Sequence, residues 1–305
     1  RELMDDKKAR KEMGRNSYFY SRHMTWQNVA LSYFNIFNDY AKIVPKRKEK
    51  LPPIKLDYIK NLTDEFGIIQ FANHTKPDTY SGYCLDDNAR ALLGCVQQYE
   101  NRRLKTTLNL IETYLKFIKF TQTSNGRFHN FVSHNRIFND RTESEDSLGR
   151  AMWALGYVKG STILPPQVSK QAGTIFKRSL RQLNEVKSLR AIAFAIIGLC
   201  YAVNQGEDPE LKKKIKQLSD KLVRRYNSQT TESGNKEWLW FEDCFTYSNY
   251  KLPEALLRAF QVTGDKEYKR IALESMKFLM SITFERKDYF SPIGQDGWYF
   301  RNGKR

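Results

Sequence analysis

The sequence predicts an all-α protein whose helical hairpins form an α/α toroid, with an inner ring of parallel helices wrapped by an outer ring. Three observations support this fold class. From residue 85 onward, apolar residues recur at helical spacing almost without interruption. Short turns alternate with two long loops, at 123–144 and 229–247, as is typical of stacked hairpins. Strongly apolar helices alternate with amphipathic ones, so some are expected to be buried and the others to lie outside.

The N-terminal region is predicted to be helical and separate from the rest. Apolar residues recur at helical spacing between Trp26 and Phe37. A stretch rich in proline and charge follows at 45–53, and its composition indicates a linker. We therefore expect one part at 1–44 and a second part at 54–305.

The second part is predicted to begin with a short helix over 54–62, followed by a turn and a short extended piece that ends at Phe71. Eight longer helices are predicted after it, over 85–100, 103–122, 145–160, 166–184, 187–205, 209–228, 248–263 and 266–283. With the short helix this makes nine, whereas a closed ring of six hairpins contains twelve. We expect one or two hairpins to be missing or to be supplied elsewhere.

Three of these helices start alike. Each carries an Arg-Ala pair near its beginning, at Arg90, Arg150 and Arg190, and each is unusually apolar and rich in small residues. These helices are expected to form the inner ring, whereas the more basic and amphipathic helices over 103–122 and 209–228 are expected outside. Inner helices of a toroid run parallel, so their N-terminal ends should line one mouth.

Acidic residues gather at two of these helix starts. Asp86 and Asp87 lie in one first turn, and Glu145 and Asp146 lie in another. Glycoside hydrolysis needs two carboxyl groups about 5–10 Å apart, one to protonate the leaving oxygen and one to activate water or attack carbon. A like-charged neighbour raises a carboxyl pKa, and Asp86 beside Asp87 provides one. We therefore predict that these four residues carry acid/base chemistry on a glycan.

A further group of residues near the expected mouth is predicted to bind the substrate. It consists of two arginines at helix starts and of acids and tryptophans in loops, where exposed aromatic rings often bind ligands. The group is Arg90, Arg150, Trp238, Trp240, Glu242, Asp243, Asp296 and Trp298. Trp153, in the middle of a helix, is expected in the core instead.

The acidic helix starts also have a structural interpretation. Aspartate in a first turn satisfies free backbone amides and complements the helix dipole. Asp86 with Arg90, and Asp146 with Arg150, form i,i+4 pairs of ordinary structural value. Asp87 has no arginine four residues later, which makes it the stronger catalytic candidate of its pair.

Composition narrows the range of partners. The net charge of +17 suggests an anionic partner, such as an acidic lipid surface, or simply a lysine-rich solvated surface. No helix-turn-helix, zinc-finger or RNA-binding signature is present, so nucleic acid is not expected. No apolar run is long enough to span a membrane, and the His and Cys spacing predicts no metal site. We expect a cytoplasmic protein without a cofactor, peripheral to the inner membrane if acidic lipid is the partner; the sequence leaves the oligomeric state open.

Two phrases resemble the C-terminal helical region of some bacterial family 4 (group 1) glycosyltransferases. The first runs from Thr63 to Ala72 and from Gly82 to Leu92, and it resembles T-D-x-x-G-I-I-Q-H-A … G-Y-C-T-D-D-N-A-R-A-L. The second covers 145–156. The resemblance extends over roughly 55–303 and departs from the family at Phe71, where the family often has histidine.

This resemblance implies a toroid like that of six-hairpin glycosidases, epimerases and polysaccharide lyases. Residues 13–30 resemble the closing helices of a two-Rossmann (GT-B) glycosyltransferase, which would make 1–44 the end of a transferase whose nucleotide-sugar site lies upstream. The expected function is a glycosidase-like domain acting on a glycan or glycoconjugate. The alternative is a non-catalytic glycan-binding or scaffolding module of a glycosyltransferase.

Overall fold

The computed structural model describes residues 6–21, 24–41, 53–140, 144–203, 208–232, 238–284, 289–294, 297–301 and 303. The chain divides into two compact units, Arg1–Pro53 (unit 1) and Ile54–Arg305 (unit 2). Within the described ranges, no helix combines the length and apolar character needed to cross a membrane.

The described residues of unit 1 include the helices α2 (Lys7–Ser21) and α3 (Trp26–Ala41). Asp6 caps α2, because its Oδ1 accepts hydrogen bonds from the amides of Lys8 and Ala9 at 2.8 and 3.0 Å. α3 begins at Trp26, where the apolar pattern of the sequence starts. Most described residues of both helices are exposed, so these helices bury little apolar surface against each other.

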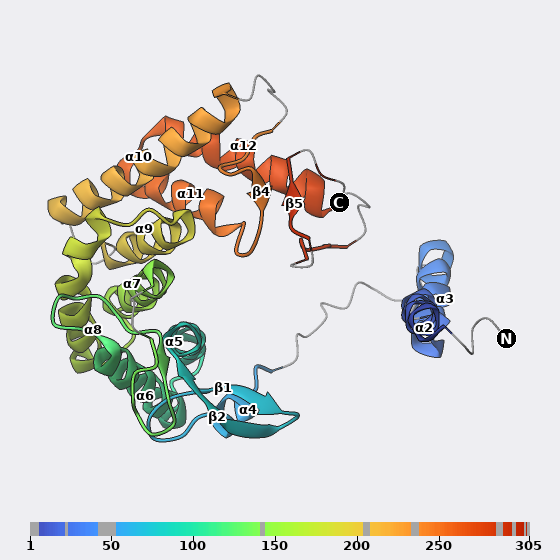
Figure 1. The fold of residues 1–305 in the computed structure, drawn as a ribbon, viewed down its shortest axis with the longest axis horizontal. Helices are drawn as coiled ribbons and strands as arrows, with labels where there is room; N and C mark the ends of the chain where they lie inside the picture. The colour runs from blue at the N-terminus through green and yellow to red at the C-terminus, as the bar shows by residue number, and fades with distance from the viewer. Residues whose placement is uncertain are drawn as a thin grey trace. The chain divides into compact units, whose positions relative to one another are not determined.

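Unit 2 contains four antiparallel helical hairpins within its described residues (Figure 1). The inner helices are α5 (Leu85–Asn101), α7 (Glu145–Gly160), α9 (Leu189–Val203) and α11 (Lys251–Thr263). The outer helices are α6 (Lys105–Thr121), α8 (Pro166–Ser179) with its 3-10 extension η2 (Leu180–Asn184), α10 (Pro209–Glu232) and α12 (Lys266–Thr283). Figure 1 shows the first set on the concave side and the second set on the convex side. The predicted α/α-toroid arrangement is therefore confirmed.

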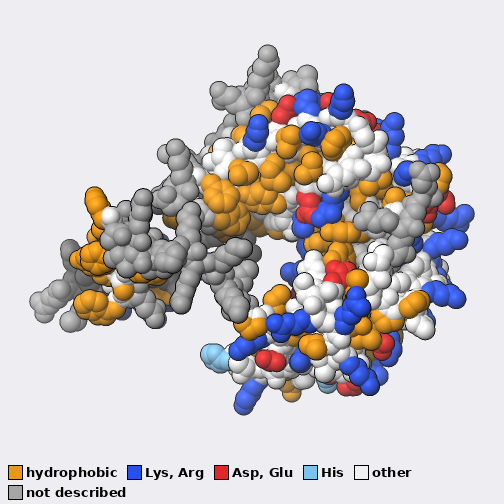
Figure 2. All heavy atoms as spheres, turned by 180° about the vertical axis from the view of Figure 1, so that it is seen from behind, with side chains coloured by type: hydrophobic (Ala, Val, Ile, Leu, Met, Phe, Trp, Pro, Cys, Tyr) orange, Lys and Arg blue, Asp and Glu red, His pale blue; other side chains and the backbone are white. Residues whose placement is uncertain are grey.

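The two sets of helices are buried as their composition predicts. α9 buries thirteen of its fifteen residues, as expected for an inner helix. α8 buries one stripe, which includes Val168, Ala172 and Ile175, and leaves its other face to solvent. Lys and Arg side chains gather along the rim of unit 2 that the outer helices form (Figure 2). Contact of this basic surface with an acidic membrane stays a prediction.

Glycines allow α7 and α9 to lie in backbone contact. A Cβ atom on Gly198 would lie 2.1 Å from the carbonyl oxygen of Met152, and one on Gly156 would lie 2.1 Å from the carbonyl oxygen of Gly198. No side chain fits at such a separation. The small residues that mark the inner helices in the sequence thus also determine how closely two of them approach.

Five short strands lie between or after the helices in the described part of unit 2. After α4 (Asp57–Asn61) come β1 (Ile69–Asn73) and β2 (Lys76–Cys84), which form an antiparallel sheet with β3 (Phe131–Val132) in the order β1-β2-β3. β4 (Cys244–Phe245) pairs with β5 (Tyr299–Phe300). The expected extended piece corresponds to the start of β1, whereas the sequence did not predict β2 and β3. Both lie in polar, turn-rich stretches that lack the regular alternation of a half-buried strand.

Candidate functional site

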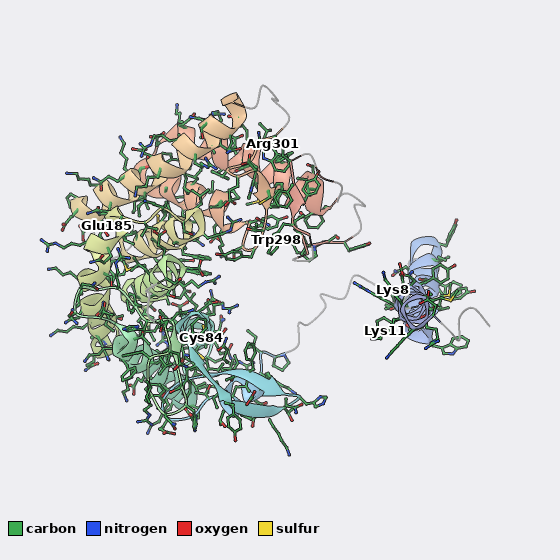
Figure 3. The ribbon with its side chains drawn as sticks, viewed as in Figure 1. Lys8, Lys11, Cys84, Glu185, Trp298 and Arg301 are labelled. Atoms are coloured by element: carbon green, nitrogen blue, oxygen red, sulfur yellow. The ribbon has the colours of Figure 1, made fainter. Side chains whose placement is uncertain are left out.

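The candidate site lies at the N-terminal ends of the inner helices. β2 leads directly into α5, with Cys84 as the last residue before the helix (Figure 3). The buried side chain of Asn88 fixes this junction, because its Nδ2 donates to the Cys84 carbonyl oxygen at 2.9 Å and its Oδ1 accepts from the Ile68 amide at 3.0 Å. Asp86 and Asp87 are thereby held in the first turn of α5.

Two arginines pair with the aspartates, and one of them, Arg150, connects aspartates of neighbouring helices. Arg90 Nη2 lies 3.0 Å from Asp86 Oδ2 and 2.7 Å from Asp87 Oδ1. Arg150 Nε lies 2.8 Å from Asp86 Oδ1 and 2.7 Å from Asp146 Oδ2. Because these last two oxygens contact one nitrogen, they are at most about 5.5 Å apart, similar to the carboxyl separation of retaining glycosidases. The predicted convergence of carboxylates from separate helices is therefore present.

Burial raises the pKa of both Asp86 and Asp87 above the ordinary aspartate value. Arg150 is the strongest opposing influence on the pKa of Asp86, and Arg90 is the strongest on that of Asp87. Among the described residues Asp87 forms an ion pair only with Arg90, whereas Asp86 forms one with each arginine. Asp87 is therefore the less constrained of the two carboxyl groups, and a raised pKa suits a general acid.

One oxygen at the centre of the cluster has no hydrogen-bond donor in the described part of the chain. The Arg150 Nε–H is directed at Asp146 Oδ2, so the buried Asp86 Oδ1 receives no hydrogen bond although Arg150 Nε lies beside it. A buried polar atom left in this way is unfavourable. The positive charge of Arg150, 2.8 Å away, offsets part of this cost.

A loop between β4 and α11 also reaches this cluster. The hydroxyl group of Tyr247 donates to Asp146 Oδ1 at 3.1 Å. Burial, followed by the charge of Asp146, raises the pKa of this hydroxyl. Tyr247 is not predicted from the sequence, because a single tyrosine in a loop has no periodicity or motif to mark it. Its place in the long predicted loop 229–247 is the one signal that the sequence gives.

Arg190 holds this loop in place from α9. The buried guanidinium donates from Nε to the Tyr247 carbonyl oxygen at 2.8 Å and from Nη2 to Asn249 Oδ1 at 3.1 Å. It also forms an ion pair with Glu242. Glu242, predicted to bind substrate, thus joins the site indirectly, by fixing the arginine that positions Tyr247.

Glu145 has a structural role in place of the predicted catalytic one. Its Oε2 accepts hydrogen bonds from the backbone amides of Lys187 and Ser188 at 2.9 and 2.6 Å. These amides directly precede α9, so a side chain of α7 caps the next inner helix. Because this carboxylate accepts hydrogen bonds from two backbone amides, we do not assign Glu145 as a catalytic acid or base.

We expect Glu145→Ala to lower the free energy of unfolding by about 1–2 kcal/mol, the usual loss when a helix cap is removed. Glu145→Gln keeps an acceptor oxygen and should retain most of that stability. Urea denaturation followed by circular dichroism measures both variants. Equal losses in the two, or none in either, would contradict the capping role.

Trp238 and Trp240 are core residues, which corrects the prediction that they bind sugar. Their exposed fractions are 4% and 0%, and both rings pack against Phe245. Trp238 Nε1 also donates to the Glu242 carbonyl oxygen at 2.7 Å. The two rings support the loop that carries Tyr247, and neither has a free face for a sugar.

The remaining predicted binding residues belong to the β4–β5 region. Asp243 pairs with Arg301 across a distance of 3.4 Å. Trp298 is half-buried and lies just before β5, in the same C-terminal segment as Arg301 (Figure 3). Asp296 lies outside the described residues.

Trp153, predicted to be in the core, is instead only partly buried.

Metal binding finds no support in the described part of the chain, where no group of three or more His, Cys, Asp or Glu residues is arranged to hold an ion. The site consists of carboxylate, guanidinium and phenol groups. The carboxyl groups can exchange protons with a ligand, and all three kinds of group can form hydrogen bonds to its hydroxyl groups.

Two solved structures share the fold of this chain. A sugar epimerase from a ruminal bacterium aligns with a TM-score of 0.63 at 14% identity, over 80% of this chain and 72% of that chain. Cellobiose 2-epimerase from Bacillus thermoamylovorans aligns with a TM-score of 0.63 at 13% identity, over 80% and 74%. The chain matches no known family and no curated protein. At this level of identity, the similarity establishes the toroid fold and leaves the reaction open.

Proposed function

We propose that unit 2 is a carbohydrate-active domain that acts on a glycan by acid/base chemistry, most simply hydrolysis of a glycosidic bond. The observation that carries the proposal is the convergence of Asp86, Asp87 and Asp146 around Arg90 and Arg150. Arg150 Nε holds carboxyl oxygens of Asp86 and Asp146 at most about 5.5 Å apart, which is no farther than in retaining glycosidases, and Arg90 joins Asp87 to Asp86. Both structural neighbours are described as epimerases of sugars, which supports a sugar as the ligand class.

Within this proposal Asp87 is the proton donor. Burial raises its pKa, which favours a proton on the carboxyl group. Asp146 accepts hydrogen bonds from Arg150 and Tyr247 and is assigned as the carboxylate partner that faces the sugar carbon or a water molecule. The side chain of Arg90 is 54% exposed, so it remains available to the hydroxyl groups of the ligand.

We expect Asp87→Asn to reduce turnover about 10²–10⁴-fold, the usual contribution of a general acid. Its free energy of unfolding should not fall, because burial disfavours the charged carboxylate that is removed. Release of reducing ends from a panel of oligosaccharides measures turnover, and urea denaturation measures stability. Asp57→Asn is the matched control, since Asp57 has an 81% exposed side chain on α4. If Asp87→Asn kept full activity, or if the wild-type protein turned over no oligosaccharide, the assignment would be wrong.

A non-catalytic glycan-binding module of a glycosyltransferase is the second candidate. It is favoured by the pairing of each mouth aspartate with an arginine, which is also the pattern of a structural ion-pair network. This candidate predicts heat of binding in calorimetry without any product. Turnover by the wild-type protein would eliminate it.

A further inference from the structure

The inner wall of unit 2 carries a second group of aromatic side chains beyond the mouth. On α7, Arg150, Trp153 and Tyr157 are spaced three and four residues apart, so they share one face of the helix. Trp153 stacks on Phe194 of α9 with ring centroids 5.6 Å apart, and Tyr157 meets Tyr201 of α9 edge to face at 4.6 Å. Trp153, Tyr157 and Tyr201 are all partly exposed.

Charged groups from the two flanking inner helices lie beside these rings. Lys251 Nζ of α11 lies 4.2 Å from the ring centre of Trp153, and the Arg258 guanidinium of α11 lies 4.5 Å from that of Tyr201. From α5, Glu100 Oε2 accepts a hydrogen bond from the Tyr157 hydroxyl at 2.8 Å. We call Trp153, Tyr157, Tyr201, Glu100, Lys251 and Arg258 the inner-wall strip.

The composition of the strip indicates a binding surface rather than a packing surface. The rings are partly exposed although Lys251 and Arg258 lie over two of them. A sugar can therefore contact the exposed parts of the rings with its C–H groups and form hydrogen bonds with the charged groups beside them. Two carboxylates balance the two cations, because Lys251 and Arg258 both pair with Glu254, at 2.7 and 2.9 Å, and Glu100 belongs to the strip. The strip therefore favours a neutral ligand over an anionic one.

The strip is continuous with the mouth and longer than one sugar ring. Arg150 belongs to the mouth cluster and lies on the same face of α7 as Trp153 and Tyr157. The distance from Arg150 to Tyr157 corresponds to about 10 Å along a helix. A ligand that contacts both ends must contain more than one sugar residue.

We propose that the inner-wall strip is a subsite for a neutral oligosaccharide, which extends from the mouth along the concave face of α7 and α9. The inference rests on the proposed function, because it takes the ligand at the mouth to be a glycan. Beyond that function, the inference specifies that the ligand is neutral and that it contains more than one sugar residue. It also names the side chains that bind the end of the ligand farthest from the aspartates.

Calorimetric titration with cello- and manno-oligosaccharides, from mono- to hexasaccharide, tests the inference. The dissociation constant of the wild-type protein should fall with length. Tyr201→Leu should weaken binding of the longer ligands about tenfold and leave the monosaccharides unaffected. Tyr157→Phe, which keeps the ring and removes only the hydrogen bond to Glu100, should show a smaller effect in the same direction. Phe120→Leu on α6, where the ring is 41% exposed, is the matched control and should bind like wild type.

The outcomes separate this inference from the proposed function. If the two tyrosine variants bind all lengths like wild type while Asp87→Asn loses turnover, the strip is not a subsite and the proposed function stands. If the protein bound oligogalacturonate more tightly than the neutral oligosaccharides, the strip would still be a subsite, but its ligand would be anionic. If the wild-type protein neither binds nor turns over any member of the series, both proposals fail.

Discussion

Gly198→Ala is expected to lower the free energy of unfolding of unit 2 by about 3 kcal/mol or more, at the upper end of overpacking effects. The added Cβ would lie 2.1 Å from the Met152 carbonyl oxygen and 2.8 Å from the Trp153 Cα, and both are backbone atoms. No rotamer change relieves such a clash, so α7 and α9 must move apart. The movement would also displace Arg150 and Trp153, which lie on the same helix. Urea denaturation measures the loss.

Gly94→Ala provides the matched control for this prediction. Gly94 lies on the exposed side of α5, and a Cβ atom there meets nothing within 4 Å. Because alanine is the better helix former, this substitution should raise stability by up to about 1 kcal/mol. If Gly198→Ala had the same free energy of unfolding as Gly94→Ala, α7 and α9 could not be in backbone contact.

Arg150→Met is expected to lower the free energy of unfolding by about 3 kcal/mol at neutral pH, as when one partner of a buried ion pair is removed. The Arg150 side chain is 9% exposed and contacts two carboxylates, that of Asp146 on its own helix α7 and that of Asp86 on α5. Methionine fills part of its volume against Phe194, so most of the loss should come from the carboxylates left without it. Turnover should fall as well, because Asp86 and Asp146 would no longer be held together.

The loss in Arg150→Met should depend on pH in a defined direction. Burial already raises the pKa of Asp86, and removing its strongest opposing charge raises that pKa further. The folded protein then binds a proton at pH values where an unfolded aspartate, with a pKa of about 3.9, does not. The stability associated with this proton is present below about pH 4 and is lost as the pH rises. Denaturation at about pH 4.5 and pH 7 should therefore show the smaller loss at the lower pH.

Arg270→Met is the control for this prediction. Arg270 on α12 also joins two carboxylates, those of Glu267 and Glu274, but its side chain is 46% exposed. Exposed ion pairs contribute about 0–1 kcal/mol, so little stability should be lost. One contrary result is that Arg150→Met lowers the free energy of unfolding no more than Arg270→Met does, and another is that it lowers this free energy by equal amounts at the two pH values. Either result would show that the ion pairs of Arg150 contribute little to the stability of unit 2.

Much of the fold could be predicted because helical periodicity is a local property. The eight predicted helices correspond to α5–α12, and the composition of the helix over 187–205 correctly places α9 in the inner ring. The convergence of Asp86, Asp87 and Asp146 was predicted because parallel inner helices bring repeated helix starts to one mouth. Their catalytic roles stay predictions.

Other parts of the site depend on contacts that local sequence does not encode. Glu145 and Asp146 are adjacent acids in one first turn, yet the first caps α9 and the second joins Arg150 and Tyr247. Trp238 and Trp240 occur in a loop, and only the packing of β4 against β5 shows that the rings are buried.

The helices, their division into an inner and an outer ring, and the end of unit 2 at which carboxylates meet could be predicted from the sequence alone. Spacing, composition and repeated helix starts are readable along the chain, because they depend on residues within a few turns of each other. Which acids share an arginine, which acid caps a neighbouring helix and which aromatic rings are buried became visible only in the folded structure. Those properties depend on partners 40 to 100 residues away, as between Glu145 and Ser188 or Asp146 and Tyr247, and on burial that only the packed helices create.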